Sequence, residues 1–193
     1  MLFRSVKKIL GTRINHEIVR LIKHFGGNAV SFNHNKYSII RATKRNNDKG
    51  PDLGFVGKVE KIMTGELKKK IDKGFIPVIA PIGKSKNNDY WNINADVVAG
   101  EVAQSLKAEK LILLTDVKGI GDSENKLISK ISLKKGQKVL KEKFIKGGMT
   151  PKLTAALEAK KNGVKSCHII DGRVPHAVLL EVLTEEGVGT MIS

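Results

Sequence analysis

Apolar runs without in–out alternation constrain the fold of this chain most strongly. Three of them, FIPVIAPIG (75–83), LILLTDV (111–117) and SCHIID (166–171), have the composition of strands that are buried on both faces. Two longer segments between them, 95–109 and 148–163, repeat apolar residues at helical spacing. Because strands of this kind need helices on both sides of the sheet, the pattern predicts an α/β fold with a mainly parallel sheet.

The N-terminal part mixes helical and alternating segments. Residues 15–27 have helical spacing, with Asn15 as the expected N-cap. Residues 28–44 alternate on both sides of the turn-like NHNK, which predicts a hairpin. A short helix is expected over 64–74, with Thr64 as its cap.

Length and composition suit one domain over residues 1–193, since 40% of the 193 residues are hydrophobic and can form a substantial core. No segment approaches the roughly 18 apolar residues of a membrane span. The start, MLFRSVKKIL, lacks the apolar core of a secretory signal. The lone Cys167 lies in an apolar run and is expected to be a buried thiol in a reducing compartment. We therefore expect a soluble, cytoplasmic protein with no membrane partner.

The formal net charge of +16 limits the partners of the chain. Such an excess suits nucleic acid, an acidic membrane or small anionic ligands. The cations are mostly lysines spread along expected helices and loops, in stretches such as LKKKIDK and LKKGQK, and aromatic residues, which stack on bases, make up 5% of the chain. These features favour a solvated lysine-rich surface over a nucleic-acid interface, and they favour anionic ligands in general.

Four polar segments fall at the expected carboxyl ends of the strands, where open α/β sheets bind ligands. They are NINAD (92–96), TD (115–116), GGMTPK (147–152) and DGR (171–173). GGMTPK opens a helix with two glycines, so it offers free N–H groups to an anion, and Lys152 adds a positive charge there. The alternative is an ordinary glycine-rich loop before a helix with a surface lysine.

The NINAD segment carries three polar side chains where a helix cap needs one. Asn94 or Asp96 is a plausible cap of the helix that follows. Asp96 and Lys152 also make a complementary pair, in which a carboxylate orients an ammonium that neutralises a transferring phosphoryl group. Asn92 can offer its amide to a carboxylate substrate. Asp116 either holds a nucleotide ribose or base, or caps the turn that follows it.

Five longer motifs cover much of the chain. They are DLGFVGKVEKI (52–62), GFIPVIAPIG (74–83), NINADVVAGEVAQSLKAEKLILLTDVKGI (92–120), GGMTPKLTAALEA (147–159) and HIIDGRVPHAVLLEVLTEEGVGTMI (168–192). Together they resemble the acetylglutamate kinases of the amino-acid kinase superfamily, in register from about residue 13 to residue 193. The resemblance implies a three-layer αβα sandwich and ATP-dependent phosphorylation of the γ-carboxylate of N-acetyl-L-glutamate, a step of arginine biosynthesis. It also implies that Mg²⁺ accompanies ATP and that the chain holds no metal site of its own.

The resemblance assigns roles to residues at matching positions. It implies that Asn92 binds N-acetylglutamate, that Asp96 organises the catalytic lysines and that Lys152 stabilises the transferring phosphoryl group. It implies a nucleotide site formed by Thr115, Asp116, Gly148, Met149 and Lys152.

The resemblance extends to the branch of the family that arginine inhibits. The matching effector residues are Lys126, His168, Glu186 and Gly189. The alternative is a core histidine with ordinary charges at helix ends. The resemblance to this branch implies that L-arginine is a feedback inhibitor and that the protein forms a homo-oligomer. Some relatives also bind a nitrogen-signalling protein of the PII type. The implied location is the cytoplasm, or the plastid stroma in a photosynthetic eukaryote.

One part of the family pattern is not matched. Members begin with a strand and a Gly-Gly phosphate loop that carries a second catalytic lysine, and nothing upstream of residue 13 resembles it. We therefore expect the C-terminal two-thirds of the fold, truncated at its N-terminus, with little or no kinase activity alone. Two alternatives stay open: another carboxylate or carbamate kinase of the superfamily, and a non-catalytic arginine-sensing or partner-binding subunit.

Overall fold

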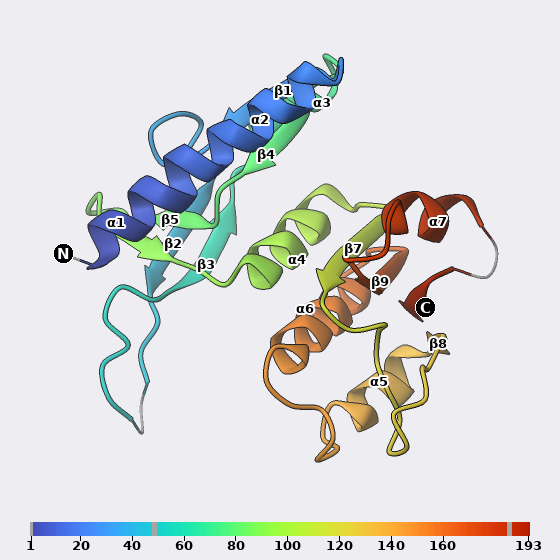
Figure 1. The fold of residues 1–193 in the computed structure, drawn as a ribbon. Helices are drawn as coiled ribbons and strands as arrows, with labels where there is room; N and C mark the ends of the chain where they lie inside the picture. Colours follow the sequence, from blue (N-terminus) through green and yellow to red (C-terminus); the bar gives the residue numbers. More distant parts are fainter. Residues whose placement is uncertain (1, 48–49, 185–186) are drawn as a thin grey trace. The chain divides into compact units, whose positions relative to one another are not determined.

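The computed structural model describes residues 2–47, 50–184 and 187–193 (Figure 1). The chain divides into two compact units, residues 1–98 and 99–193, and each unit is described by itself. The expectation of a single domain for the whole chain stays a prediction.

The first unit opens with three consecutive helical stretches: α1 (Leu2–Lys8), the π-helix η1 (Ile9–Ile14) and α2 (Asn15–His24). The expected N-cap at Asn15 is wrong, because the Asn15 backbone is helical and the helix continues upstream of it. The Asn15 side chain is buried, its Nδ2 donates to the Val78 carbonyl oxygen at 2.8 Å, and its Oδ1 accepts from the Ser31 hydroxyl. This polar residue therefore ties the helix to neighbouring strands instead of starting it.

Two sheets supply the strands of the first unit. β1 (Ala29–Phe32) pairs in parallel with β4 (Ile76–Ile79), and α2 packs against both strands (Figure 1). The second sheet has the order β3-β2-β5-β6 and is built from β3 (Gly57–Ile62), β2 (Ile40–Lys44), β5 (Ile82–Lys84) and β6 (Tyr90–Asn92). In this sheet β2 pairs antiparallel to β3 and parallel to β5, while β5 and β6 are antiparallel.

The expected hairpin over 28–44 is wrong, because β1 and β2 belong to different sheets. The turn itself does form within the NHNK segment. There the Asn33 side-chain oxygen accepts from the backbone N–H groups of Asn35 and Lys36, both at 2.9 Å. A side chain that closes its own turn in this way does not require the flanking strands to pair.

Two further local predictions differ from the structure. The run 75–83 is divided between β4 and β5, because Pro81 has no N–H to donate to a ladder and stands between them. Helix α3 (Thr64–Ile71) forms as expected, but Thr64 is its first residue and not its cap. The cap position is Met63, and no side chain accepts from the helix N-terminus there.

The second unit contains one sheet, in the order β7-β9-β10-β8. β7 and β9 run in parallel, with Thr115 opposite Asp171 at their carboxyl ends, while β10 is antiparallel to β9 and parallel to β8. The strands are β7 (Lys110–Thr115), β8 (Lys130–Ile131), β9 (Ser166–Asp171) and β10 (Gly189–Ile192). The helices are α4 (Ala95–Leu106), whose first residues belong to the first unit, α5 (Leu133–Val139), α6 (Met149–Lys161) and α7 (Ala177–Leu183).

An apolar cluster of buried side chains joins this sheet to its helices. Leu153 and Ile169 are fully buried in it, and full burial of such a side chain contributes about 1.5–3 kcal/mol. The cluster consists of Ala103, Leu111, Leu113, Ile120, Ile131, Val139, Leu153, Ala155, Ala156, Leu157, Ala159, Val164, Cys167, Ile169 and Ile192.

The predicted α/β class with parallel strands is confirmed. Among the strand pairs formed by the described residues, four are parallel and three are antiparallel. No helix in the described part of the chain is long and apolar enough to cross a membrane.

Candidate functional site

The carboxyl ends of β7 and β9 lie at the same edge of the second unit's sheet. The two strands are parallel and in register up to Thr115 and Asp171. Polar and charged residues follow each strand directly, with Asp116 and Lys118 after β7 and Arg173 after β9. This edge is where parallel sheets present ligand-binding groups.

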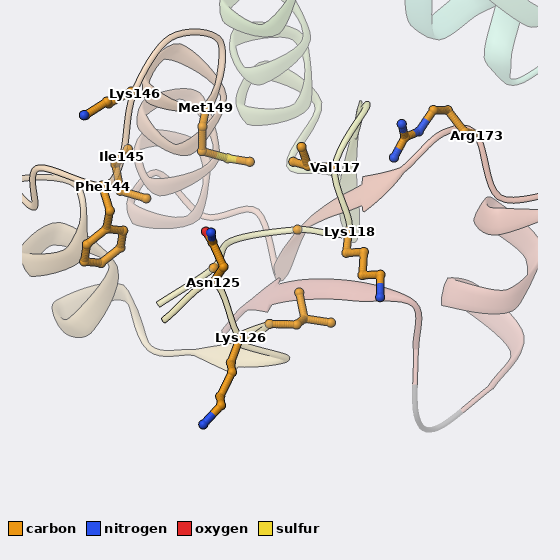
Figure 2. Close-up of a pocket in the computed structure, with 12 residues that line it drawn as sticks. Val117, Lys118, Asn125, Lys126, Phe144, Ile145, Lys146, Met149 and Arg173 are labelled. Atoms are coloured by element: carbon orange, nitrogen blue, oxygen red, sulfur yellow. The ribbon is translucent and has the colours of Figure 1, made fainter. Parts of the chain in front are cut away.

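A pocket of about 700 Å³ opens beside this edge (Figure 2). Four of the side chains that line it are cations, and none of its lining residues in the described part of the chain is Asp or Glu. The volume is that of a small-molecule site, and the charge favours an anionic ligand with an apolar part. The lining residues are Val117, Lys118, Gly119, Gly121, Asn125, Lys126, Leu127, Phe144, Ile145, Lys146, Met149 and Arg173.

The residues expected to bind nucleotide gather at or next to this pocket. Met149 lines it, and Gly148 directly precedes Met149 in the chain. Thr115 and Asp116 immediately precede the lining residue Val117. The Thr115 hydroxyl donates a hydrogen bond to Asp116 Oδ1 at 3.4 Å. Four predicted residues from two distant segments therefore meet in one region of the second unit.

Helix α6 begins at this pocket and leaves its N-terminus uncapped by side chains. The cap position is Gly148, and no side-chain oxygen accepts there. Gly147 before it has φ 55°, a left-handed conformation that suits glycine. The Met149 N–H donates to the Lys146 carbonyl oxygen at 3.2 Å, and no side chain caps the first turn, which is the uncapped helix start that the GGMTPK motif predicts as an anion site. Half-buried Lys152 lies in the same turn.

The expected substrate residues lie in the first unit. Asn92 ends β6, is half-buried, and donates its backbone N–H to the Phe55 carbonyl oxygen at 2.8 Å. Asp96 lies in the first turn of α4. Asn94 is the cap of that helix, since its Oδ1 accepts from the backbone N–H groups of Asp96 at 2.9 Å and Val97 at 3.2 Å. Of the two caps that the sequence offered, the structure shows Asn94 in that role.

A second pocket, of about 340 Å³, lies elsewhere in the second unit and contains a buried pair. His168 Nδ1 lies 2.6 Å from Glu181 Oε1, and Ser166 Oγ lies 2.9 Å from His168 Nε2. Glu181 Oε2 also accepts from the Val188 N–H at 2.6 Å. His168, Glu181, Gly187 and Gly189 line the pocket together with Lys110 and Lys130.

The structure divides the expected arginine residues between the two pockets. His168 and Gly189 line the second pocket, but Lys126 lines the first and pairs with Glu124 at 2.8 Å. Glu186 lies outside the described residues. Gly189 has a structural role as well, because a Cβ there would meet the carbonyl oxygen of Ile169.

Two residues of these pockets, Glu181 and Arg173, were not predicted from the sequence. Glu181 stands in an apolar helix between Leu180 and Val182, and a carboxylate in such a run is a signal of a buried pairing. Arg173 was noted only as part of a strand end. It donates from Nε and Nη2 to the two oxygens of Asp171, at 3.0 and 2.8 Å. These hydrogen bonds from Arg173, with that from its backbone N–H, lower the pKa of Asp171 to about 2.

A sequence model of the amino acid kinase family matches residues 5–171. The chain belongs to this family. The match begins at residue 5, so the likeness extends upstream of residue 13, where the sequence motifs placed its start. Lys152 and the nucleotide-side residues all lie within the matched range, whereas Gly189 lies beyond it.

Curated relatives carry a common description. The chain is 48% identical over 193 residues to an acetylglutamate kinase from Nitrosomonas eutropha, and 44% identical over 193 residues to one from Herminiimonas arsenicoxydans. Each alignment covers 97% of this chain and 65% of the relative. An acetylglutamate kinase from Heliobacterium modesticaldum is 46% identical, with 67% of its length covered. The chain thus spans about two-thirds of the length of these relatives.

Solved structures share the fold. N-acetylglutamate synthase from Neisseria gonorrhoeae, complexed with coenzyme A and L-arginine, has a TM-score of 0.76 and 26% identity, over 86% of this chain and 38% of that one. Carbamate kinase from Giardia has a TM-score of 0.68 and 19% identity, over 98% of this chain and 71% of that one. The second likeness shows the amino acid kinase fold alone.

Proposed function

We propose that this chain is part of an acetylglutamate kinase, which transfers the γ-phosphoryl group of ATP to the γ-carboxylate of N-acetyl-L-glutamate. The observation that carries the proposal is the cationic pocket beside the open N-terminus of α6, with Lys152 in the first turn of that helix. The identity of 44–48% to relatives named acetylglutamate kinase supports the choice of reaction.

The 700 Å³ pocket suits a nucleotide because its two kinds of lining match the two parts of ATP. Apolar side chains such as Val117 and Met149 suit an adenine ring, and the cations suit phosphates. Mg²⁺ enters as part of the Mg-ATP substrate, held by the phosphates.

The reaction is an in-line displacement that depends on positioning and charge. A γ-carboxylate oxygen of N-acetylglutamate attacks the γ-phosphorus, the bond to the bridging oxygen of ADP breaks, and an acyl phosphate forms. Lys152 stabilises the charge on the phosphoryl group as it transfers, Asp96 orients the catalytic ammonium, and Asn92 binds the acceptor. Removal of one preorganised donor aimed at developing charge costs about 2.7–4 kcal/mol of barrier in oxyanion sites.

The second pocket supports an arginine-binding role, in which the Glu181 carboxylate, positioned by His168, recognises a guanidinium or an α-amino group. The observation that favours it is that the Glu181 carboxylate is shielded from solvent and lines a cavity. A carboxylate can accept two parallel hydrogen bonds from a guanidinium. This is also the basis of the second candidate function, a non-catalytic arginine-sensing subunit. The homo-oligomer, a PII-type partner and a cytoplasmic location accompany the kinase proposal as expectations.

The test combines a turnover assay with a binding assay. ADP release is measured with Mg-ATP and N-acetylglutamate, glutamate or carbamate as acceptor, and Mg-ADP and L-arginine binding are measured by calorimetry. Lys152→Ala should abolish N-acetylglutamate-dependent ADP release, while Lys161→Ala, at the exposed far end of the same helix, should leave it unchanged. Because weak turnover by these 193 residues alone remains a prediction, binding is measured independently.

The outcomes separate the candidates. ADP release with carbamate or glutamate, but not with N-acetylglutamate, would show that the chain belongs to another kinase of the family with that acceptor. Arginine binding without any nucleotide binding would contradict the kinase and favour the sensing subunit.

A further inference from the structure

Arg173 differs from the other cations of the first pocket in how it is held. Asp171, the last residue of β9, is 5% exposed and accepts three hydrogen bonds from Arg173. They come from the backbone N–H at 2.9 Å, from Nε at 3.0 Å and from Nη2 at 2.8 Å. A guanidinium bound through two parallel hydrogen bonds has a defined plane and direction. Its orientation is therefore fixed before any ligand arrives.

The arrangement leaves donors for a ligand. A guanidinium has five N–H groups, and Asp171 occupies two of them, so about three remain. The Arg173 side chain is 67% exposed and lines the pocket. In Figure 2 the guanidinium extends toward Val117, and Met149 lies on the other side of Val117. The unused donors are therefore available to a molecule in the pocket.

The lysines of the pocket are less suited to this task. Lys126 pairs with Glu124 at 2.8 Å and is 74% exposed. In Figure 2 the ammonium groups of Lys126 and Lys146 extend away from Val117 and Met149. A lysine must also lose the freedom of a long flexible side chain when it binds a ligand, whereas Arg173 has already lost that freedom to Asp171. Arg173 is thus better prepared to bind a phosphate than Lys126 or Lys146.

We propose that Arg173 binds a phosphate of the nucleotide in this pocket, and that Asp171 is the positioning residue that aims its guanidinium. The inference rests on the proposed function, because it requires a nucleotide in the pocket. Lys118 supplements the site, since its charge acts on Asp171 as well and offsets part of the negative charge that Asp171 adds.

The test measures how affinity depends on the number of phosphates. Displacement of a fluorescent ADP analogue gives the affinities of adenosine, AMP, ADP and ATP for the full chain and for Arg173→Ala, Arg173→Lys and Asp171→Asn. Arg173→Ala is expected to weaken ADP about 10- to 100-fold, the usual effect of a hydrogen-bonded charge, and adenosine less than about twofold. Lys161→Ala, outside the pocket, should change neither affinity.

A double-mutant cycle tests the positioning role. If Asp171 acts only through Arg173, then Asp171→Asn combined with Arg173→Ala should weaken ADP no more than Arg173→Ala does by itself. Arg173→Lys keeps the charge but loses the two-point contact, so it should recover only part of the ADP affinity. Circular dichroism melting curves identify any variant that has lost its fold, and Arg173→Lys then serves in place of Arg173→Ala.

The results distinguish this inference from the proposed function. Nucleotide binding by the wild-type chain with equal losses for ADP and adenosine in Arg173→Ala, or with no loss, would overturn the inference and leave the kinase proposal standing. If the wild-type chain binds neither ADP nor adenosine, both fail together.

Discussion

Two buried histidines, one in each unit, have different hydrogen-bonding surroundings. In the second unit, His168 has Glu181 at one ring nitrogen and Ser166 at the other. In the first unit, His34 is 8% exposed, yet its Nδ1 has no hydrogen-bond partner among the described residues. Burial, and then the charge of Lys7, lower the pKa of His34. Burial alone therefore does not tell whether a histidine stabilises its surroundings.

The same contrast holds for two threonines. In the second unit, the hydroxyl oxygen of Thr190 accepts from the buried N–H of Ile120 at 2.8 Å. In the first unit, the hydroxyl of Thr43 is buried without a partner among the described residues. A buried polar group with a partner costs little, while one without a partner costs its full desolvation. The polar groups of His168 and Thr190 should thus contribute to the stability of the second unit, while those of His34 and Thr43 should detract from that of the first.

The largest expected effect comes from the histidines. His168→Leu leaves the Glu181 carboxylate buried opposite an apolar side chain and should lower the free energy of unfolding of the second unit by about 3–5 kcal/mol. His34→Leu has a similar volume and breaks no hydrogen bond at Nδ1, so its cost should be below about 1.5 kcal/mol.

Two natural probes report on the units separately in urea titrations. The only tryptophan, Trp91, lies in the first unit, and the only cysteine, Cys167, is buried in the second. Burial raises the pKa of the Cys167 thiol to about 11, so a thiol reagent at pH 8 should label it only after the second unit opens. Equal costs for the two histidine variants would break the comparison.

An intermediate effect is expected from the threonines. Thr190→Val removes the acceptor of the Ile120 N–H and should cost about 1–3 kcal/mol in the second unit. Thr43→Val removes an unpartnered hydroxyl from a strand and should leave the stability of the first unit unchanged or raise it slightly. Urea midpoints followed by Trp91 fluorescence and Cys167 labelling measure both, and a clear loss of stability in Thr43→Val would contradict the assignment of an unpartnered hydroxyl.

The smallest expected effect is a difference between two carboxylates in acid. Hydrogen bonds from Arg173 lower the pKa of Asp171 to about 2, and a hydrogen bond from Lys44 lowers the pKa of exposed Asp52. A carboxylate with a lowered pKa in the folded state stabilises the fold above its ordinary pKa of about 3.9. That contribution disappears as the pH falls through the folded-state value.

The measurement is the urea midpoint at pH 5, 4, 3 and 2, followed by circular dichroism. Asp171→Asn should flatten the fall in stability between pH 4 and pH 2–3 more than Asp52→Asn does. If Asp52→Asn flattened it as much, the ion pair of the second unit would have no advantage over an exposed one in the first.

Helical periodicity was a reliable guide to the fold where local signals and tertiary contacts agree. Helices α4 and α6 form at the predicted segments, and Asn94 caps α4 as one of the two readings expected. The expected cap at Thr64 was wrong, because Thr64 lies inside its helix and Met63 occupies the cap position. A threonine near a helix start carries the same local signal in either position.

Long-range pairing left no comparable signal. Residues 28–44 have the alternation of a hairpin, but β1 pairs with β4, more than forty residues away in the chain. Asn15 likewise has the sequence of a cap and the position of a buried anchor, because its partner Val78 comes from that same distant strand. Alternation specifies which side chains share a face, not which strand becomes the neighbour.

The sequence by itself determined the family, the α/β class and the residues of the GGMTPK motif, because glycine, proline and apolar spacing act through local sterics and solvent exclusion. Only the tertiary structure decided that Arg173 lines the first pocket while two of its N–H groups bind Asp171. It also decided that Glu181 pairs with His168 in the second pocket and that Lys126 lines the first. These contacts depend on where strands and loops end in space, and that position is set by packing between segments that are far apart in the chain.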